Sequence, residues 1–563
     1  MSPATPCLFV RPAWILSGLI ALFLSLRLPG AGAPVDDIFH RTNLLRLSIS
    51  IPEEGRQALR VPRSTHNSAR KPEAQATVSE GERAYTNVTV QLKGYTTFQG
   101  LDGRPSLTLD FNKHAPGQKF HGLTKISLNN SLQDVTRLNE KLSRELFAAA
   151  GVPVPQADYA LLTLDGRELG LYVLVEGYDK TFLKRHFRRA DGELYEGGTL
   201  MDITRPLHLL AGQEDGGEAA VTRLVKAARE KNPEQRWREL NAALDTDRFL
   251  SMMTMETILC HSDSYSMNRN NYRLYHDPTT GKLIFLPHGM DRVLGTHRST
   301  LDLPIVPPSL GLVARAVLST PQGRRAQINR VGLLFTNHFD PDKLCRRVRE
   351  LDARIADFKT SEQVDGHFDD RLADSAAHDA DNLCERIAKR ADEIRFQLAY
   401  APELLAAAPV PEFDTNGVAP LVGWQPVRTA IRPEPAYEIS VGNELIHLHA
   451  KSGALAASLR CHIALPVGSY RLSGHLEATN TTGQLVSPRL TVLRYSSDRF
   501  DGRRQTLRPP EIDFSFQVSE ARAPEEIEFY CDLNDESSDV WLDTPSLTII
   551  DSEKRSATPY KNP

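Results

Sequence analysis

The chain has 563 residues, of which 40% are hydrophobic and 25% charged, and its formal net charge is −4. This length exceeds what one hydrophobic core usually organises, so we expect two or more globular domains. The near-neutral balance, without a long run of one sign, excludes the strongly basic surface that is typical of nucleic-acid or membrane-surface binding. Net charge therefore does not indicate the substrate.

The N-terminus has the pattern of a secretory signal peptide. Arg11 precedes an apolar run of 14 residues from Ala13 to Leu26, and Ala31-Gly32-Ala33 supplies the small residues that a signal peptidase accepts. Because a membrane-spanning helix needs about 20 apolar residues, we expect a signal peptide over residues 1–33, export to the periplasm, the cell envelope or the medium, and no transmembrane helix in the mature chain. Pro34 is unfavourable beside the cleavage site, so an uncleaved N-terminal anchor is the alternative.

Five cysteines lie beyond the predicted signal peptide, an odd number that cannot all pair. Cys461 and Cys531 could form a disulfide in an oxidising compartment. Cys345 and Cys384 could form a second one, which would leave Cys260 alone. Buried free thiols are the alternative for each pair.

Strand patterns dominate the first part of the chain. In chain order, we predict strands at 44–51, 88–92, 106–111 and 125–128, a helix at 134–150 and strands at 157–164 and 169–176. The helix is predicted because Leu138, Leu142 and Leu146 share one face at helical spacing. Asp165-Gly166 is typical of a tight hairpin turn between the last two strands.

The middle of the chain changes to helical patterns, and its last quarter to short strands. We predict helices at 180–187, 219–230 and 247–260, a hairpin of strands at 271–275 and 282–286, several helices over 311–405, and strands at 436–441, 470–477, 489–494 and 512–518. The fold class is therefore α+β followed by an all-β sandwich. We place the first domain at 38–405, a linker rich in Ala and Pro at 406–417 and the β-sandwich at 418–555.

The segment that follows the 247–260 helix carries the strongest chemical signal. His261-Ser262-Asp263 is followed five residues later by Asn268, and Asp291 comes after the next hairpin. This order is that of a kinase catalytic loop, in which the aspartate accepts the proton of the attacking hydroxyl and the asparagine helps to hold magnesium. We therefore predict Asp263 as the catalytic base and Asn268 and Asp291 as metal ligands.

A kinase plan also needs a lysine that grips the upstream phosphates and is itself held by a glutamate on a helix. Lys125 begins the third strand counted from 88–92, and Glu140 and Glu145 lie on the helix that follows. In the element order, Lys125 and either glutamate occupy these places. Lys93 and Lys113 are alternatives for the lysine.

Two further features complete the predicted nucleotide site. Glu176, at the end of the strand that follows the helix and one hairpin, stands where a hinge would face the adenine, and the loop Gly94–Gly103 could cover the phosphates. Each of these residues also has an ordinary interpretation, since a D-x4-N match arises by chance, a lone lysine is usually solvated and an aspartate at a strand end is often a turn residue. The conjunction of all of them in the right order favours the kinase interpretation.

Several segments together resemble the spore coat protein H (CotH) kinase family over residues 38–400. The segments are LKGYTTFQG, FHGLTKISLNNSLQD, NEKLSRELFAAAGVP, GLYVLVEGYDKTFLKRHF, LYEGG and NRNNYRLYHDPTTGKLIFLPHGMDRVLG. The resemblance implies an atypical, bilobal protein-kinase-like fold, ATP with Mg²⁺ or Mn²⁺ as cofactors, and transfer of phosphate to Ser or Thr hydroxyls of envelope or surface proteins. By motif, it also implies Asp263 as the catalytic aspartate and Asn268 and Asp291 as metal ligands.

One position departs from the family pattern. Many members have two aspartates in a D-x-D motif where this chain has Gly289-Met290-Asp291. If the missing first aspartate is the true ligand, activity is lost, whereas if Asp291 is the ligand, nothing essential is missing. Asn270 and Asn271 could supply compensating oxygens.

The C-terminal region resembles jelly-roll carbohydrate-binding modules in the segments LPVGSYRLSGHLEATN and VWLDTPSLTII. Trp424, Tyr470 and Trp541 could stack on sugars, although we expect them to lie in the core. The alternative to an exported kinase is therefore an inactive kinase-fold scaffold or adhesin whose sandwich binds glycan or protein. A glycoside hydrolase is disfavoured because no recognisable pair of acids is present.

Overall fold

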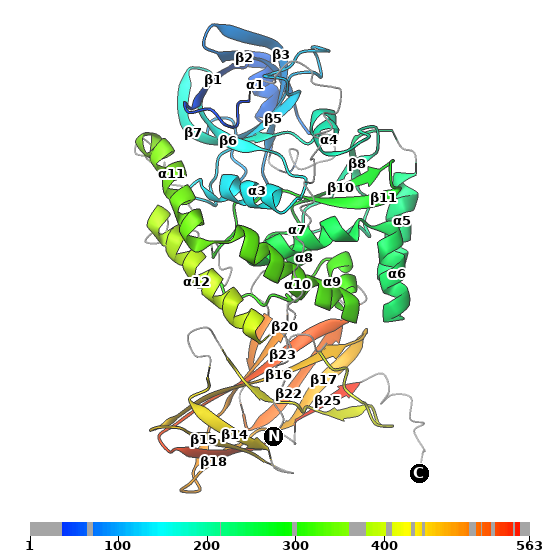
Figure 1. Cartoon of the computed structure of the whole chain (residues 1–563), viewed down its shortest axis with the longest axis vertical. Coiled ribbons are helices and arrows are strands. Elements are labelled where there is room, and N and C mark those ends of the chain that lie inside the picture. The colour runs from blue at the N-terminus through cyan, green and yellow to red at the C-terminus, as the bar shows by residue number, and fades with distance from the viewer. Residues whose placement is uncertain are drawn as a thin grey trace, which may run out of the picture.

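The structure is a computed structural model of the full chain (Figure 1). It describes residues 37–551 except for 63, 65–70, 214–215, 296–300, 360–378, 401–407, 429–433, 442–444, 495–502, 508, 520–523 and 544–546. The predicted signal peptide at 1–33 lies outside the described residues.

Seven strands close into a barrel at one end of the molecule, at the top of Figure 1. They are β1 (Leu45–Ser50), β2 (Ala74–Glu80), β3 (Arg83–Lys93), β4 (Ser106–Asp110), β5 (Lys125–Asn129), β6 (Ala157–Leu164) and β7 (Arg167–Glu176), with helix α1 (Glu53–Leu59) between β1 and β2. Neighbours are antiparallel except β1 and β6, whose parallel pairing closes the barrel. Alternate residues of β1 are buried, as the period of two requires.

The barrel differs from the prediction by one strand. Strand β2 was not anticipated, because its inward residues Ala74 and Ala76 are small and give a weak hydrophobic pattern. The hairpin between β6 and β7 has the predicted turn at Asp165 and Gly166, whose φ angles are 50° and 79°. These positive angles suit a type I′ turn, which matches the twist of the strands.

Helix α3 (Asn139–Ala149) lies beneath the barrel and starts five residues later than predicted. The delay has a local cause, because Asp134 accepts a hydrogen bond from the Asn139 amide at 2.9 Å and another from Thr136 Oγ1 at 2.5 Å. These bonds hold residues 134–138 as a turn that precedes the helix.

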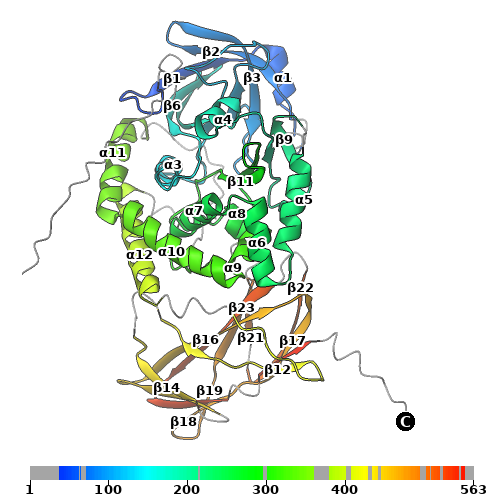
Figure 2. The same cartoon turned by 45° about the vertical axis from the view of Figure 1, so that its right-hand side comes forward.

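The rest of the α+β region is mainly helical and includes a four-stranded sheet in the order β11-β10-β8-β9. Its elements are α4 (Lys180–His186), β8 (Leu194–Glu196), β9 (His208–Ala211), α5 (Gly217–Ala228), α6 (Pro233–Ala243), α7 (Thr246–Ile258), α8 (Tyr265–Asn268), β10 (Tyr272–Asp277), β11 (Lys282–Pro287), α9 (Leu312–Leu318), α10 (Pro321–His338), α11 (Pro341–Lys359) and α12 (Ala380–Ala399). In Figure 2, α11 and α12 flank one side and α5 and α6 the other, with α7 to α10 between them. None of the described helices has the length and apolar character that crossing a membrane requires.

The described regular elements of the C-terminal region are strands, which form three sheets. They are β12 (Val418–Pro420), β13 (Gln425–Pro426), β14 (Tyr437–Val441), β15 (Ile446–Ala450), β16 (Leu455–Leu465), β17 (Gly468–His475), β18 (Ala478–Asn480), β19 (Leu485–Val486), β20 (Arg489–Arg494), β21 (Arg503–Leu507), β22 (Glu511–Val518), β23 (Glu525–Asp535), β24 (Asp539–Leu542) and β25 (Thr548–Asp551). Trp424 and Tyr470 lie in its core, as expected, whereas Trp541 is half-buried and stacks on His447 with ring centroids 4.8 Å apart.

The sandwich is joined to the helical region by a salt bridge and by the connecting chain. Arg324 of α10 pairs with Glu526 of β23 at 2.8 Å, and the Ala464 amide of β16 donates to the Pro409 carbonyl at 3.0 Å. The five described cysteines are all thiols. Cys384 Sγ lies 3.9 Å from the Cys345 carbonyl, so this predicted pair is adjacent.

The second predicted disulfide pair is not placed face to face. The register of β16 and β23 sets Cys461 opposite Phe529 and Cys531 opposite Leu459. Because the two cysteines are diagonal neighbours, their side chains do not meet as a directly opposed pair would.

Candidate active site

A tightly folded loop follows α7 and carries Asp263. The amide of His261 donates to the Glu256 carbonyl at 2.8 Å, and the Glu256 carboxylate accepts from the Ser266 amide at 3.2 Å. Burial raises the pKa of Glu256 to about 7, although hydrogen bonds from this loop oppose the rise. The buried glutamate therefore acts as an internal anchor that gives the loop one shape.

The carboxylate of Asp263 is held between two amide side chains. Asn268 Nδ2 donates to Asp263 Oδ1 at 3.0 Å, and Asn271 Nδ2 donates to Asp263 Oδ2 at 3.0 Å and to its carbonyl at 2.9 Å. The Arg292 guanidinium lies 3.9 Å from Oδ2. The structure thus brings together Asp263 and Asn268 as the sequence predicted, and it adds Asn271, which the sequence suggested only as a source of oxygen.

The remaining oxygen of Asn268 is the site's clearest chemical clue. Asn268 Oδ1 is buried and has no hydrogen-bond partner among the residues that the structure describes. Buried amide oxygens are nearly always satisfied, so such an oxygen needs a partner from outside the chain, such as water or a cation.

Asp291 lies close to two other carboxylates. Its removal from water, and then the negative charges of Glu140 and Asp263, raise its pKa to about 7. A bound cation would reverse this effect, because it favours the ionised form. Asp291 is also fixed through its backbone, since its carbonyl accepts from Asn139 Nδ2 at 2.9 Å.

These oxygens fit a magnesium ion. Two carboxylates and an amide are hard oxygen ligands of the kind that Mg²⁺ prefers, and phosphate oxygens usually complete its shell. Within the described ranges no cluster of three His, Cys, Asp or Glu side chains could hold a metal by itself. A metal here would therefore be held by Asn268 and Asp291 together with oxygens of a ligand, with the Asp263 carboxylate beside it.

Glu140 links α3 to the segment before Asp291. Its Oε2 accepts from the Met290 amide at 2.9 Å, and its Oε1 accepts from Arg144 Nε at 2.9 Å. Burial alone would raise the pKa of Glu140, but Arg144, the Met290 amide and Lys93 bring it below the usual value. Glu140 is therefore a buried anion.

The lysine near Glu140 is Lys93 and not Lys125. Lys93 Nζ donates to Asn129 at 2.7 Å, and its removal from water lowers its pKa to about 8, while the Glu140 charge acts in the opposite direction. Lys125 faces Asp110 directly across β4 and β5 and pairs with it at 3.3 Å. The expected role of Lys125 does not match this geometry, because its cross-strand partner holds it elsewhere.

Lys113 and Glu145, which the element order also allows for the lysine and the glutamate, lie in separate ion pairs. Lys113 contacts Glu73 at 2.5 Å and Glu145 contacts Arg347 at 2.8 Å. Element order could not distinguish these residues from Lys93 and Glu140, since it says nothing about which side of a strand or helix faces the site.

Glu176 is at the end of β7, as predicted, but its carboxylate is already used. It accepts from Arg185 Nη1 at 2.5 Å and from the Gln156 amide at 3.0 Å. Burial raises its pKa, and Arg185 opposes the rise. The side chain therefore has a structural partner on α4 rather than an open edge for a base.

The loop Gly94–Gly103 is folded back on the barrel. Asn130 is buried, and its Nδ2 donates to the carbonyls of Thr97 at 3.1 Å and Arg104 at 2.9 Å. Gly94 has a φ of 106°, which side chains rarely adopt. This loop continues directly from Lys93 and is held in one conformation by Asn130.

Of a group of cations near the site, sequence reasoning named only Lys93. Arg273, Lys93, Arg144 and Lys71 all act, after burial, to lower the pKa of His288 well below its usual value. Glu196 pairs with Arg273 at 2.6 Å. These cations are far apart in the chain and share no motif, so only the fold reveals that they form a positive environment suited to a polyanion.

Gly289 is required by its surroundings. Its φ is 54°, and a Cβ placed there would lie 2.6 Å from Asn271 Oδ1. An aspartate at this position would therefore collide with the side chain that holds Asp263. The departure from D-x-D is thus accompanied by Asn271 in the adjoining space.

Comparison with known proteins identifies the family. The model of the CotH kinase protein family matches residues 91–394. The inner spore coat protein H of Bacillus subtilis is 24% identical over 190 residues, which are 31% of this chain and 51% of that protein. The chain thus matches about half the length of this curated relative.

Solved structures are similar to each part of the chain. The Helicobacter pylori proinflammatory kinase CtkA is 12% identical, covers 54% of this chain and 95% of its own, and has a TM-score of 0.27. The carbohydrate-binding module TmCBM61, solved with β-1,4-galactotriose, is 11% identical, covers 23% of this chain and 90% of its own, and has a TM-score of 0.16.

The predicted fold class is confirmed, with an α+β region that matches the CotH kinase protein model, followed by an all-β sandwich. The predicted resemblance is confirmed as well. Because the family match covers more than half of the 563 residues, the protein belongs to the CotH kinase protein family.

Proposed function

We propose that this protein is an exported atypical protein kinase that transfers the γ-phosphate of ATP, with Mg²⁺ or Mn²⁺, to Ser or Thr hydroxyls of envelope or surface proteins. One observation carries the proposal. Asp263 accepts from Asn268 and lies close enough to Asp291 to raise its pKa, and the buried Asn268 Oδ1 has no partner in the described part of the chain, which a cation would supply.

Each residue then has a defined task. Asp263, oriented by Asn268 and Asn271, accepts the proton of the attacking hydroxyl. Magnesium, when bound, neutralises phosphate charge and orients the transferred group. Asp291 and Asn268 would hold it, and Lys93, paired electrostatically with Glu140, would grip the upstream phosphates.

The surrounding charges support a nucleotide triphosphate as ligand. Lys71, Arg144 and Arg273 add to Lys93 around the site, while Glu140 and Glu196 offset only part of their charge. Phosphoryl transfer needs positioning and charge neutralisation more than covalent chemistry, and this arrangement supplies both.

The first test is incorporation of labelled phosphate from γ-labelled ATP with Mg²⁺ or Mn²⁺ into the protein itself and into a generic protein acceptor. We expect incorporation by the wild type, a loss of about 100-fold or more in Asp263→Ala, and a comparable loss in Asp291→Ala. ATP-dependent thermal stabilisation should persist in Asp263→Ala and lose its magnesium dependence in Asp291→Ala.

A non-catalytic scaffold is the second candidate, and Gly289 is the observation that favours it, since the family's first D-x-D aspartate is absent. In that case the β-sandwich would bind a surface glycan or protein, and half-buried Trp541 would be the residue available for stacking. If the wild type shows no phosphate incorporation and no thermal shift with Mg-ATP, the result favours the scaffold.

A further inference from the structure

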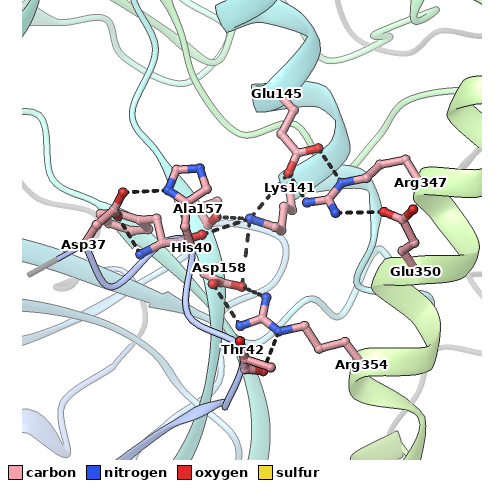
Figure 3. A network of polar contacts seen from close by, with 11 residues as sticks. Asp37, His40, Thr42, Lys141, Glu145, Ala157, Asp158, Arg347, Glu350 and Arg354 are labelled. Carbon is pink, nitrogen blue, oxygen red and sulfur yellow. Dashed lines mark hydrogen bonds and ion pairs between the residues drawn. The ribbon is translucent and has the colours of Figure 1, made fainter.

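Helix α3 carries polar groups on two sides. Towards the site, Asn139 donates to the Asp291 carbonyl and Glu140 accepts from the Met290 amide, both at 2.9 Å. Lys141 and Glu145 follow at the next position and one turn later, so they share a different face of the helix. That face meets α11 in a network of charged residues (Figure 3).

The network joins α3 and β6 to α11 through two arginines. Arg347 Nε and Nη2 contact the Glu145 carboxylate at 3.0 and 2.8 Å. Two turns further along α11, Arg354 Nη1 and Nη2 contact the Asp158 carboxylate of β6 at 2.5 and 3.0 Å. Two-pronged arginine–carboxylate pairs fix orientation as well as distance.

Lys141 fills the space between these pairs, as Figure 3 shows. It is 4% exposed, and its Nζ donates to the Ala157 carbonyl at 2.8 Å and lies 3.4 Å from Glu145 and 3.9 Å from Asp158. Asp158 is 1% exposed, so its charge depends on Arg354 and Lys141. Arg347 and Glu145 are 37% and 36% exposed, so the buried part of the network is Lys141 and Asp158. Because these two buried charges depend on their partners, the network favours one arrangement of α3, β6 and α11.

We propose that Arg347 and Arg354 are positioning residues that set α3 and, through Asn139 and Glu140, fix the segment Met290-Asp291. Their effect on catalysis rests on the proposed function, but the mechanical coupling from α11 to Met290 does not. Helix α11 thereby keeps the segment Met290-Asp291 in position before any ligand binds.

The test is hydrogen exchange of the peptide that contains Met290, measured on the full chain without ligand. In Arg347→Gln, we expect the Met290 amide to exchange about tenfold faster, because α3 loses one support and the bond to Glu140 opens more often. Glu145→Gln should act in the same direction, and the double variant should be less than additive, because both changes remove the Arg347–Glu145 pair.

A matched control lies two residues away on the same helix. Arg349 pairs with Asp381 of α12 at 3.2 Å instead of with α3, so Arg349→Gln should leave Met290 exchange unchanged. A peptide from α10 serves as an internal reference, since global destabilisation accelerates both peptides equally. Equal acceleration in the two peptides, no acceleration, or additive effects in the double variant would overturn the proposal.

The functional consequence is measured separately. If the wild type binds Mg-ATP, Arg347→Gln should weaken that binding about tenfold while Arg349→Gln leaves it unchanged. If the wild type binds no nucleotide, the proposed function fails, but the exchange result still decides whether α11 positions Met290. The Arg354→Gln variant should show the same direction with a larger loss of stability, because Asp158 is deeply buried.

Discussion

The α+β region and the β-sandwich differ in where their charged side chains lie. In the α+β region, Glu140, Lys141 and Asp158 are buried and form networks between elements far apart in sequence. In the sandwich the interior is mostly apolar, and pairs such as Arg471 with Asp513, 42% and 61% exposed, lie on the surface. Exposed pairs of this kind contribute little to stability.

The difference indicates which region of the fold positions a functional site. Burying a charge costs free energy unless the charge is well paired, so a region that does so repeatedly is holding particular groups in place. Glu140 accepts from the Met290 amide beside Asp291, and Lys141 and Asp158 support α3. The sandwich, by contrast, follows the simple alternation of apolar and polar residues.

The largest expected effect is on the rate of phosphate transfer when Lys93 is replaced. Lys93→Met should lower phosphate transfer by about 100-fold or more, because a charge on the upstream phosphates stabilises the negative charge that develops on the leaving group in the transition state. Lys125→Met is the matched control and should stay within about twofold, since it only breaks a partly exposed pair with Asp110. Initial rates at saturating ATP check both, and the reverse result would restore Lys125 as the clamp.

The second effect is the pH dependence of stability through Glu256. Its pKa is about 7 in the folded protein, above the ordinary value of 4.5, so the folded state holds a proton that the unfolded state releases. The group therefore favours folding most below pH 4.5, and this contribution is lost as pH rises to about 7, by about 3 kcal/mol in all.

Glu256→Gln should remove this dependence. The difference in free energy of unfolding between variant and wild type, measured in urea at about pH 5 and about pH 7, should shift by a few kcal/mol in favour of the variant at the higher pH. If the difference in free energy of unfolding stays constant with pH, Glu256 does not hold a proton in the folded state.

A smaller effect is expected at Gly289. Gly289→Asp should cost about 2 kcal/mol of stability, because the left-handed φ strains any side chain and the Cβ meets Asn271. Combining it with Asn271→Gly removes the collision and should recover part of the loss. Thermal unfolding of the single and double variants tests this, and equal stability of wild type and Gly289→Asp would show that Asn271 moves freely.

The smallest effect is expected at Trp541 of the sandwich. Trp541→Ala should cost about 1 kcal/mol, because the ring is half-buried and stacks on His447, whereas Trp424→Ala in the core should cost about 3–5 kcal/mol. Phosphate transfer should be unchanged in Trp541→Ala. A loss of activity there would mean that the two regions are coupled more closely than their charges indicate.

The sequence by itself determined much of the order of elements, although not β2, β8, β9 or α6, and the candidate catalytic motif. Alternation and turn residues located β6, β7 and the hairpin of β10 and β11, and the spacing of Asp263, Asn268 and Asp291 indicated their shared site. These features depend on residues close together in the chain, where periodicity and turn chemistry act directly.

Only the tertiary structure decided which charges meet. It brought Lys93 rather than Lys125 to Glu140, gave Glu176 to Arg185, and set Arg347 against Glu145 across 202 positions of sequence. Each choice depends on which face of a strand or helix turns inward and on the register between strands. A long-range pairing leaves no local pattern, so neither spacing nor composition could have predicted it.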